Sequence, residues 1–301
     1  MSTNIRGCLL VGSVPLANNE EVFRECLAGM PSRLKRLPDG ETGNRYMFTL
    51  WQSAVFQVAP EMLLNYALDS GARSRTTTED EVDEIVAKLE KAGIETEYDT
   101  AAIESYAVFK KLREEGVIPQ DVKFQVGLPS VGNVVPVFIE KAFQAKVWPL
   151  YEQALFRAIR NIQDKISHHD LAIQLDLALD SAFWEGQFLR PAFADTHNVK
   201  EYVAEYTLRM IEQIDPEVEL GIHNCYGDIE HKALLRAQVS PSRCRSWSSD
   251  FRTLVTPDQF LPCAGAGQCC GLPGRVPCAL EADPAEVQRA WDRAVSWSHT
   301  V

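Results

Sequence analysis

Several features that would mark this 301-residue sequence as a membrane, secreted or nucleic-acid-binding protein are absent. No apolar run approaches the roughly 18 residues that a membrane span requires. Residues 1–6 do not form the charged start of a signal peptide, and no apolar core with a cleavage site follows them. Basic residues are few, 30 Lys and Arg against 42 Asp and Glu, and the net charge of −12 argues against a basic nucleic-acid-binding surface. We therefore expect a cytoplasmic protein with a small-molecule substrate and no nucleic-acid or membrane partner.

Two sequence motifs are also missing. The first apolar run, residues 7–12, ends in Gly-Ser-Val-Pro and lacks the G-x-G-x-x-G of a dinucleotide-binding Rossmann domain. The eight cysteines include the adjacent pair Cys269 and Cys270 but no C-x-x-C spacing. Their spacing therefore argues against a zinc ribbon.

Residues 1–237 instead contain an alternation of short apolar runs and amphipathic segments. The pattern predicts strands over 7–12, 34–37, 122–127, 171–177 and 218–222, and helices over 19–30, 46–57, 78–92, 100–114, 146–165 and 198–213. Repeated strand-then-helix units imply a parallel sheet with right-handed crossovers. Polar side chains follow most of these strands, and in a barrel such strand ends converge on one face. We therefore favour an α/β fold of the (β/α)8 TIM barrel type over an open sheet.

The composition changes abruptly after residue 237. The last 64 residues, 238–301, hold five of the eight cysteines and three of the six tryptophans but no Lys, Ile, Tyr or Asn. Their six Arg balance six acidic residues, so the whole net charge belongs to residues 1–237. Apart from a predicted helix over 284–297, no regular pattern continues there. We expect a barrel portion over 1–237, incomplete or irregular beyond it, and an irregular tail such as a change of reading frame or splicing would produce.

The sharpest chemical feature is His223-x-Cys225, directly after the fifth predicted strand. Residues two apart on an extended chain point to the same side, so an imidazole and a thiolate there can bind one Zn²⁺. Alone the pair is a weak signal, because a buried cysteine is usually a small apolar side chain. A catalytic zinc ion typically takes three protein ligands, and candidates for a further ligand are Cys263 and Cys269.

A second polar cluster, Asp39-Gly-Glu41 with Arg45, follows the second predicted strand. Pro-Asp-Gly is a common turn sequence, so turn formation alone could explain it. The polar run continues to Arg45, however, which is longer than a turn requires. The alternative is a carboxylate pair that binds a cationic or amino group, with Arg45 neutralising one carboxylate or binding an anion. The nearby Trp51 is expected to pack.

Polar residues also interrupt the fourth predicted strand at Gln174 and Asp176. In a barrel such period-2 positions point to the lumen, where an unpaired carboxylate is costly, so we expect a ligand contact or a structural ion pair. His168 and His169 precede this strand, which places them at the opposite end of the barrel in a solvated or capping role. Asp180 is expected in the loop after the strand.

Together these residues resemble the barrel family of cobalamin-independent methionine synthase, in particular its stand-alone single-barrel relatives, which share a superfamily with uroporphyrinogen decarboxylase. The resemblance covers about residues 7–235 and is carried by four motifs in order: Gly12-Ser-Val-Pro15, Asp39-Gly-Glu41 with Arg45, Gln174-x-Asp176, and His223-x-Cys225-Tyr226. The family usually has Gln-x-Asp-Glu-Pro in its fourth strand, whereas Leu177 follows Asp176 here. The sequence therefore looks like a divergent branch.

The resemblance implies a zinc-dependent enzyme that transfers a methyl or alkyl group to a thiol or similar small nucleophile. In that family, zinc held by His, Cys, Glu and a second Cys activates the substrate thiol as a thiolate. By resemblance, the first two metal ligands are His223 and Cys225. We expect catalytic roles for Asp39 and Asp176, and a substrate-binding set of Ser13, Glu41, Arg45, Gln174, Tyr226 and Asp228.

Two other interpretations stay open. The superfamily also suggests a metal-independent lyase or decarboxylase, in which Asp39, Glu41 and Arg45 would carry the chemistry. The irregular tail is consistent with a degenerate, inactive barrel that has a binding role. Zinc content distinguishes the zinc-dependent transferase from the metal-independent enzyme. The degenerate barrel predicts that no thiol ligand stabilises the protein.

Overall fold

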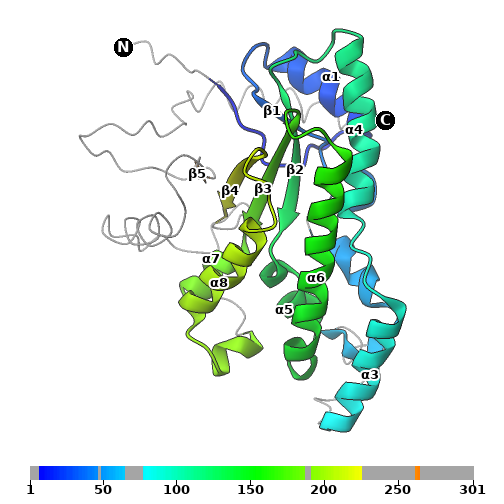
Figure 1. Cartoon of the computed structure of the whole chain (residues 1–301), viewed down its shortest axis with the longest axis vertical. Helices are drawn as coiled ribbons and strands as arrows, with labels where there is room; N and C mark the ends of the chain where they lie inside the picture. Colours follow the sequence, from blue (N-terminus) through cyan, green and yellow to red (C-terminus); the bar gives the residue numbers. More distant parts are fainter. Residues whose placement is uncertain (1–6, 47–48, 65–76, 187–190, 226–261, 265–301) are drawn as a thin grey trace, which may run out of the picture.

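The computed structural model describes residues 7–46, 49–64, 77–186, 191–225 and 262–264. Its core is a parallel sheet in a mixed α/β arrangement, with strand order β1-β2-β3-β4-β5 (Figure 1). The strands are β1 (Arg36–Pro38), β2 (Lys123–Pro129), β3 (Leu171–Leu177), β4 (Glu219–Asn224) and β5 (Pro262–Ala264). Each strand therefore lies beside the one that precedes it along the chain, which is the order that successive crossovers of one hand produce.

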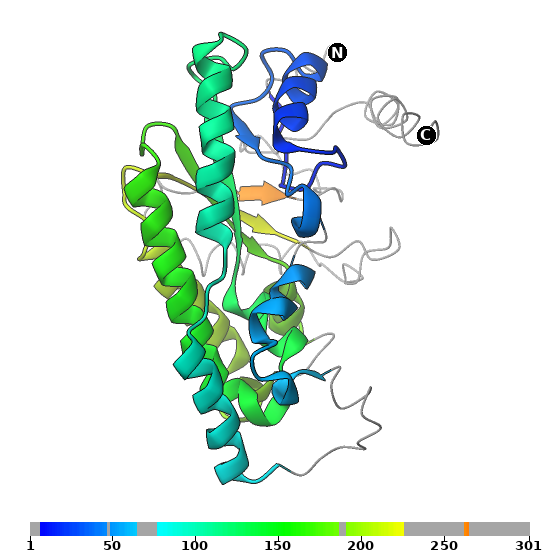
Figure 2. The same cartoon turned by 90° about the vertical axis from the view of Figure 1, so that its right-hand side faces the viewer.

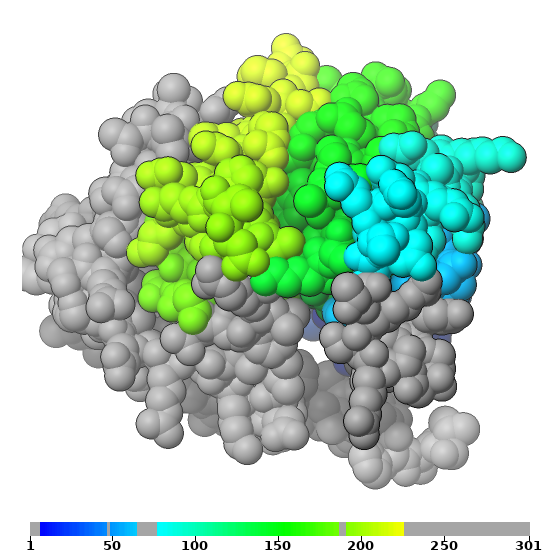
Figure 3. Space-filling view, turned by 90° about the horizontal axis from the view of Figure 1, so that it is seen from below, coloured from blue at the N-terminus to red at the C-terminus, as the bar shows by residue number. Residues whose placement is uncertain are grey.

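Helices cover one face of this sheet, as Figure 2 shows for α4 and α6. The α-helices are α1 (Asn19–Gly29), α3 (Glu79–Ala92), α4 (Tyr98–Glu114), α5 (Val135–Phe138), α6 (Lys141–Lys165), α7 (Leu179–Trp184) and α8 (Val199–Ile211). Short 3₁₀ turns are η1 (Gly43–Arg45), η2 (Leu50–Phe56), η3 (Pro60–Met62), η4 (Val131–Asn133) and η5 (Ala192–Asp195). Seen from below, α3 and α8 lie on either side of the α5 and α6 residues (Figure 3).

An aromatic cluster joins the first helices to the sheet. The rings of Phe23 on α1 and Phe109 on α4 lie 5.6 Å apart, and Phe109 lies 5.3 Å from Phe124 on β2. All three side chains are buried, so the even-numbered residues of β2 face the helices. Within the described residues, no helix has both the length and the apolar character needed to cross a membrane.

The opposite face of the sheet is concave. Arg36 on β1 and Glu219 on β4 form an ion pair, although β2 and β3 lie between their strands. Three strand spacings amount to about 14 Å on a flat sheet, and side chains that stand roughly perpendicular to such a sheet would not meet across that distance. The ion pair therefore indicates that the sheet curves toward the face that carries Arg36 and Glu219. Lys123 on β2, with its Nζ 3.8 Å from Glu219 Oε2, lies on the same face.

Four predicted strands and five predicted helices agree with the structure to within a few residues. Their ends follow local chemistry. Asn18 caps α1 through a hydrogen bond from the Glu21 backbone N–H, and Thr78 with Glu81 forms a complete capping box at α3.

The predicted strand over 7–12 is wrong. Cys8 makes one parallel bridge to Leu34, after which the segment leaves the sheet, and Leu9 and Val11 are 37% and 40% exposed. The backbone carbonyls of Leu10 and Val11 accept hydrogen bonds from side-chain amides of the sheet, and not from the backbone of a neighbouring strand. This substitutes for the ladder that a buried strand would make.

The predicted helix over 46–57 is also wrong, because η2 has 3₁₀ geometry. The Ser53 hydroxyl bonds back to the Leu50 carbonyl at 2.9 Å, and the Gln52 amide donates to the Thr96 carbonyl at 3.0 Å. These side-chain bonds hold a tighter turn than an α-helix. The predicted helix over 284–297 lies outside the described residues, as does the tail apart from β5.

Candidate functional site

Two adjoining hollows lie at the carboxyl ends of β1, β2 and β3, on the concave side of the sheet. The first is lined by Glu41, Arg45, Trp51, Tyr98, Gly127, Pro129 and Asp176. The second shares four of these residues and extends along β2 to Gln125, beside Gly12 and Asp39. Carboxyl ends of parallel strands are the usual site of chemistry in α/β proteins. The structure therefore brings the predicted Asp39, Glu41, Arg45 and Asp176 together in one place.

Asp39 is a buried carboxylate whose oxygens are all engaged. Arg45 Nη2 lies 2.5 Å from its Oδ2, Ser105 Oγ donates to the same oxygen at 2.7 Å, and the Glu41 backbone N–H donates to Oδ1 at 3.0 Å. Three donors on its two oxygens hold this carboxylate in one orientation. These contacts show that Asp39 holds Arg45 and the loop, and a direct catalytic role for Asp39 stays a prediction.

The carboxylate of Glu41, in the same loop, has fewer hydrogen-bond donors around it than that of Asp39. It accepts a hydrogen bond from the Ser13 hydroxyl, and a Cβ at Gly12 would come within 2.9 Å of Oε1. Half-buried between Asp39 and Asp176, Glu41 has its pKa raised to about 7, because burial and the two neighbouring carboxylates outweigh Ser13 and Arg45. Glu41 is therefore a group able to take or give a proton near neutral pH.

Gly127 separates Glu41 from Asp176 at the pocket. A Cβ there would lie 3.4 Å from Asp176 Oδ2 and 3.5 Å from Glu41 Oε1. The two carboxylates thus face the same small space above β2. Such a pair of acceptors suits a cationic or multiply protonated group of a ligand.

Asp176 also orients His223 on the neighbouring strand. His223 Nδ1 lies 3.0 Å from Asp176 Oδ1, and Gln174 Nε2 donates to the same oxygen at 2.9 Å. Burial alone would lower the pKa of His223, but the hydrogen bond to Asp176 and the neighbouring Cys225 raise it to about 9. Burial raises the pKa of Asp176, although the hydrogen bonds from His223 and Gln174 act against this rise.

Cys225 follows directly after β4, and its backbone N–H donates to the Leu177 carbonyl at 3.2 Å. This extended geometry places Cys225 on the same side of the chain as His223, as the spacing predicted. The β4–β5 pairing brings Cys263 to the register position beside His223. Tyr226 and Asp228, which we expected to bind substrate, lie outside the described residues.

Gln125 and Gln174 form a buried polar layer beneath the carboxylates. Gln125 Nε2 donates to the carbonyls of Leu10 and Val11, both at 2.9 Å, and Gln174 Nε2 donates to Val11 at 2.7 Å. These bonds hold the N-terminal segment across the concave face and bring Ser13 to Glu41. Gln174 therefore positions the N-terminal segment and Asp176.

Sequence reasoning missed three residues of the site: Tyr98, Ser105 and Gln125. Tyr98 packs edge-on against Trp51, with ring centroids 4.8 Å apart, and both rings line the first hollow. Trp51 thus packs, as expected, and also forms a wall of the site. Of these three residues, only Gln125 could have been recognised as a site candidate from the sequence, because it is a polar residue within an apolar strand, as Gln174 is.

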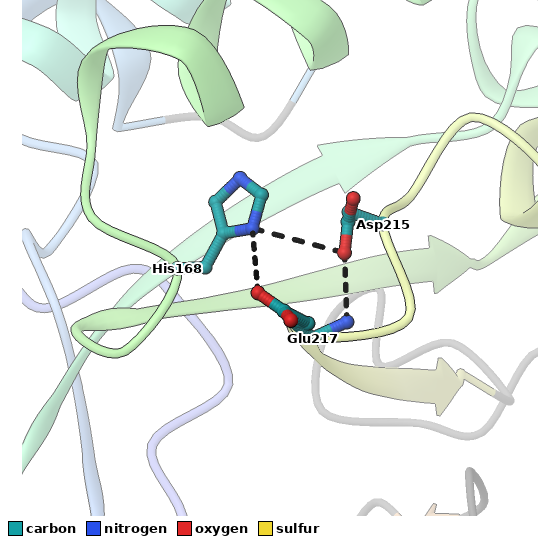
Figure 4. A group of neighbouring side chains, drawn as sticks. All are labelled: His168, Asp215 and Glu217. Carbon is teal, nitrogen blue, oxygen red and sulfur yellow. Dashed lines mark hydrogen bonds and ion pairs between the residues drawn. The ribbon is translucent and has the colours of Figure 1, made fainter.

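A separate group of His168, Asp215 and Glu217 lies at the opposite, amino end of the strands (Figure 4). His168 Nδ1 is 3.7 Å from Asp215 Oδ1 and 3.9 Å from Glu217 Oε2. Glu217 is 85% exposed, so a solvated ion-pair group explains the arrangement.

The charge state of Glu41 gives a prediction about stability. A pKa raised from 4.5 to about 7 means that the folded state binds a proton more tightly, so Glu41 lowers stability as pH rises between these values. We expect this contribution to be about 3 kcal/mol, and Glu41→Gln to remove it. Urea unfolding of both proteins with chelator present, at intervals from pH 4.5 to pH 8, measures the difference. Parallel stability curves for the two proteins would contradict the assignment.

Comparison with known proteins adds nothing to this geometry. The chain matches no known family model, no curated protein and no solved structure.

Proposed function

We propose that the protein is a zinc-dependent enzyme that transfers a methyl or alkyl group to a thiol or similar small nucleophile. The observation that supports it most strongly is the 3.0 Å contact between Asp176 and Nδ1 of His223. Histidines that bind metal almost always donate their other ring nitrogen to a carboxylate or carbonyl, which fixes the tautomer. With Nδ1 engaged, Nε2 of His223 is the nitrogen left for a metal, and Cys225 is next to the ring.

The donor set suits zinc. An imidazole and a thiolate are ligands that zinc prefers, and a buried carboxylate behind the histidine is the usual supporting group. His223 and Cys225 would hold the ion, and the register of β5 makes Cys263 our candidate for a third ligand. When bound, zinc would lower the pKa of a substrate thiol so that a thiolate exists at neutral pH.

The remaining site residues would bind and enclose the substrate. Glu41 and Asp176 face one space across Gly127 and would bind its cationic group, with Glu41 held by Ser13. Arg45 lines the same hollow and would contact an anionic part of the substrate while Asp39 holds it. The aromatic walls would exclude water from the reacting atoms.

We propose a (β/α)8 barrel, complete or partial, as the scaffold. Three features support this proposal: parallel strands in sequential order, the curvature that the Arg36–Glu219 ion pair indicates, and polar side chains at the carboxyl ends of the strands. All three are properties of TIM barrels. The motif resemblance to cobalamin-independent methionine synthase supports the same scaffold.

A matched pair of ligands tests the proposed substrate class. We expect a small amino-acid thiol such as homocysteine to raise the melting temperature of the zinc-loaded protein. Its hydroxyl analogue homoserine should have little effect, because only the thiol can bind as a thiolate. Differential scanning fluorimetry of one protein preparation with both ligands measures this. Equal shifts for thiol and alcohol, or no shift for either, would contradict the proposal, and the second result would favour a degenerate barrel.

A metal-independent lyase or decarboxylase is the second candidate. The observation in its favour is Glu41, whose pKa of about 7 lets it act as a general acid or base beside Arg45. The two candidates differ in their need for metal. A lyase would keep its activity in the presence of chelator and in Cys225→Ala, whereas a zinc-dependent transferase would lose it in both.

A further inference from the structure

Asp180 is a second carboxylate behind the site, and it is fully buried on α7 rather than in the loop that we expected. Ser130 Oγ donates to its Oδ1 at 2.6 Å, Asn133 Nδ2 donates to its Oδ2 at 2.8 Å, and the Tyr206 hydroxyl donates to Oδ1. A Cβ at Gly132 would lie 2.7 Å from both Asp180 Oδ1 and Tyr206 Oη. The chain between β2 and α5 is therefore packed directly on this carboxylate, and burying it without these donors would be costly.

Asn133 connects this carboxylate to the carboxyl end of β3, the strand that carries Asp176. Its Nδ2 also lies 2.9 Å from the backbone carbonyl of Asp176, and its Oδ1 accepts from the Leu179 backbone N–H at 2.8 Å. Ser130 N–H is 3.4 Å from the same Asp176 carbonyl. The amide of Asn133 therefore joins the carboxyl end of β3 to the start of α7, and Asp180 fixes the orientation of that amide.

We propose that Asp180 is a positioning residue for the site. With Asn133 and Tyr206 it fixes the end of β3, so that the Asp176 side chain holds the His223 ring in the orientation that metal binding needs. This inference rests on the proposed metal site of His223 and Cys225. A network in which every polar group has a partner is rigid, and loss of one member leaves the others unpaired.

Two variants test the inference in the full chain. Asp180→Asn keeps the shape of the side chain but replaces one acceptor oxygen with a donor, and Tyr206→Phe removes only the hydroxyl. We expect each to weaken zinc binding by about 10-fold, the effect usual for groups that orient a ligand. We also expect each to shift the ¹⁵N and ¹H signals of the His223 ring in the metal-free protein. Competition with a chromogenic chelator and long-range ¹⁵N–¹H NMR measure the two effects.

Asp170→Asn is the matched control. Asp170 is also a largely buried carboxylate, and it accepts hydrogen bonds from Tyr106 at 2.7 Å and Arg113 at 2.6 Å, but at the amino end of β3. We expect this variant to lower stability while zinc affinity and the His223 signals stay as in the wild type. If it moves them as much as Asp180→Asn does, the effect is general destabilisation and the inference is wrong.

The remaining outcomes separate this inference from the proposed function. Wild-type zinc affinity and unchanged His223 signals in both variants would overturn the positioning role of Asp180. If Asp180→Asn does not fold, Tyr206→Phe decides alone. If the wild-type protein binds no zinc, the proposed function fails, and the His223 signals of the metal-free variants still decide whether Asp180 orients the ring.

Discussion

His223→Ala is expected to weaken zinc binding by more than about 100-fold, because it removes a direct ligand, and loss of a supporting group already costs 10- to 100-fold. The substitution leaves Asp176 without its main partner, so the free energy of unfolding of the metal-free protein should also fall, by about 1 to 3 kcal/mol. Titration with zinc against a chromogenic chelator gives the affinity. Urea unfolding with chelator present gives the stability.

His168→Ala is the matched control for this experiment. His168 is also a partly buried histidine beside carboxylates, with Asp215 at 3.7 Å, but it lies at the other end of the strands. We expect its zinc affinity to equal that of the wild type. Equal losses in the two variants, or a larger loss in His168→Ala, would contradict the assignment of the metal to His223.

Gly40→Ala is expected to have the largest effect on stability, a loss of about 2 to 4 kcal/mol. Gly40 has a φ of +82°, which disfavours a residue with a side chain by about 1 kcal/mol or more. Its added Cβ would also lie 2.5 Å from Cγ2 of Val22 on α1, a fully buried side chain, and overpacking of this kind costs about 1 to 3 kcal/mol. Thermal or urea unfolding measures the loss.

Gly43→Ala separates the two causes. Gly43 belongs to the same loop and has a φ of +68°, but its added Cβ would meet nothing within 4 Å. We therefore expect about 1 kcal/mol, the cost of the backbone conformation alone. A loss as large as that of Gly40→Ala would show that the contact with Val22 contributes little.

The regular elements of the chain were predictable where local signals agree. The strand over 171–177 was predicted to the residue, because a continuous apolar run with two polar residues has no competing helical pattern. The helix at 79–92 begins where Thr78 and Glu81 complete a capping box. For this helix, the local sequence contains both the helical periodicity and the capping residues that mark where the helix begins.

The N-terminal segment could not be predicted in the same way. Residues 7–12 have the composition of a buried strand, but whether a strand forms depends on a partner on each side. In the structure the carbonyls of Leu10 and Val11 bond to the amides of Gln125 and Gln174, which are more than 110 residues away in the chain. No local pattern contains that information.

The candidate site was predicted in part. Asp39, Glu41, Arg45, Asp176 and His223 come together because parallel strands bring their carboxyl ends to one edge, which is a property of the fold class. The division of roles was not predictable, because it depends on partners. Asp39 has its oxygens occupied by three donors, whereas Glu41 has one hydroxyl, and only the folded structure distinguishes these two neighbours.

Asp180 is the residue whose structural role was least predictable from the sequence. In the sequence it follows a strand and resembles a loop residue, yet it is buried beneath three donors from the β2–α5 connection and α8. Its partners Ser130, Asn133 and Tyr206 have ordinary spacing and form no motif. Such networks depend on tertiary packing and leave no periodic signal.

The most direct test of the central claim is the zinc content of the purified full chain, with and without Cys225. We predict about one zinc ion per chain in the wild-type protein by elemental analysis, and close to none in Cys225→Ala after the same dialysis against a weak chelator. Cys26→Ala is the control, since Cys26 is buried on α1, away from the site. Wild-type protein without zinc, or zinc retained in full by Cys225→Ala, would contradict the account.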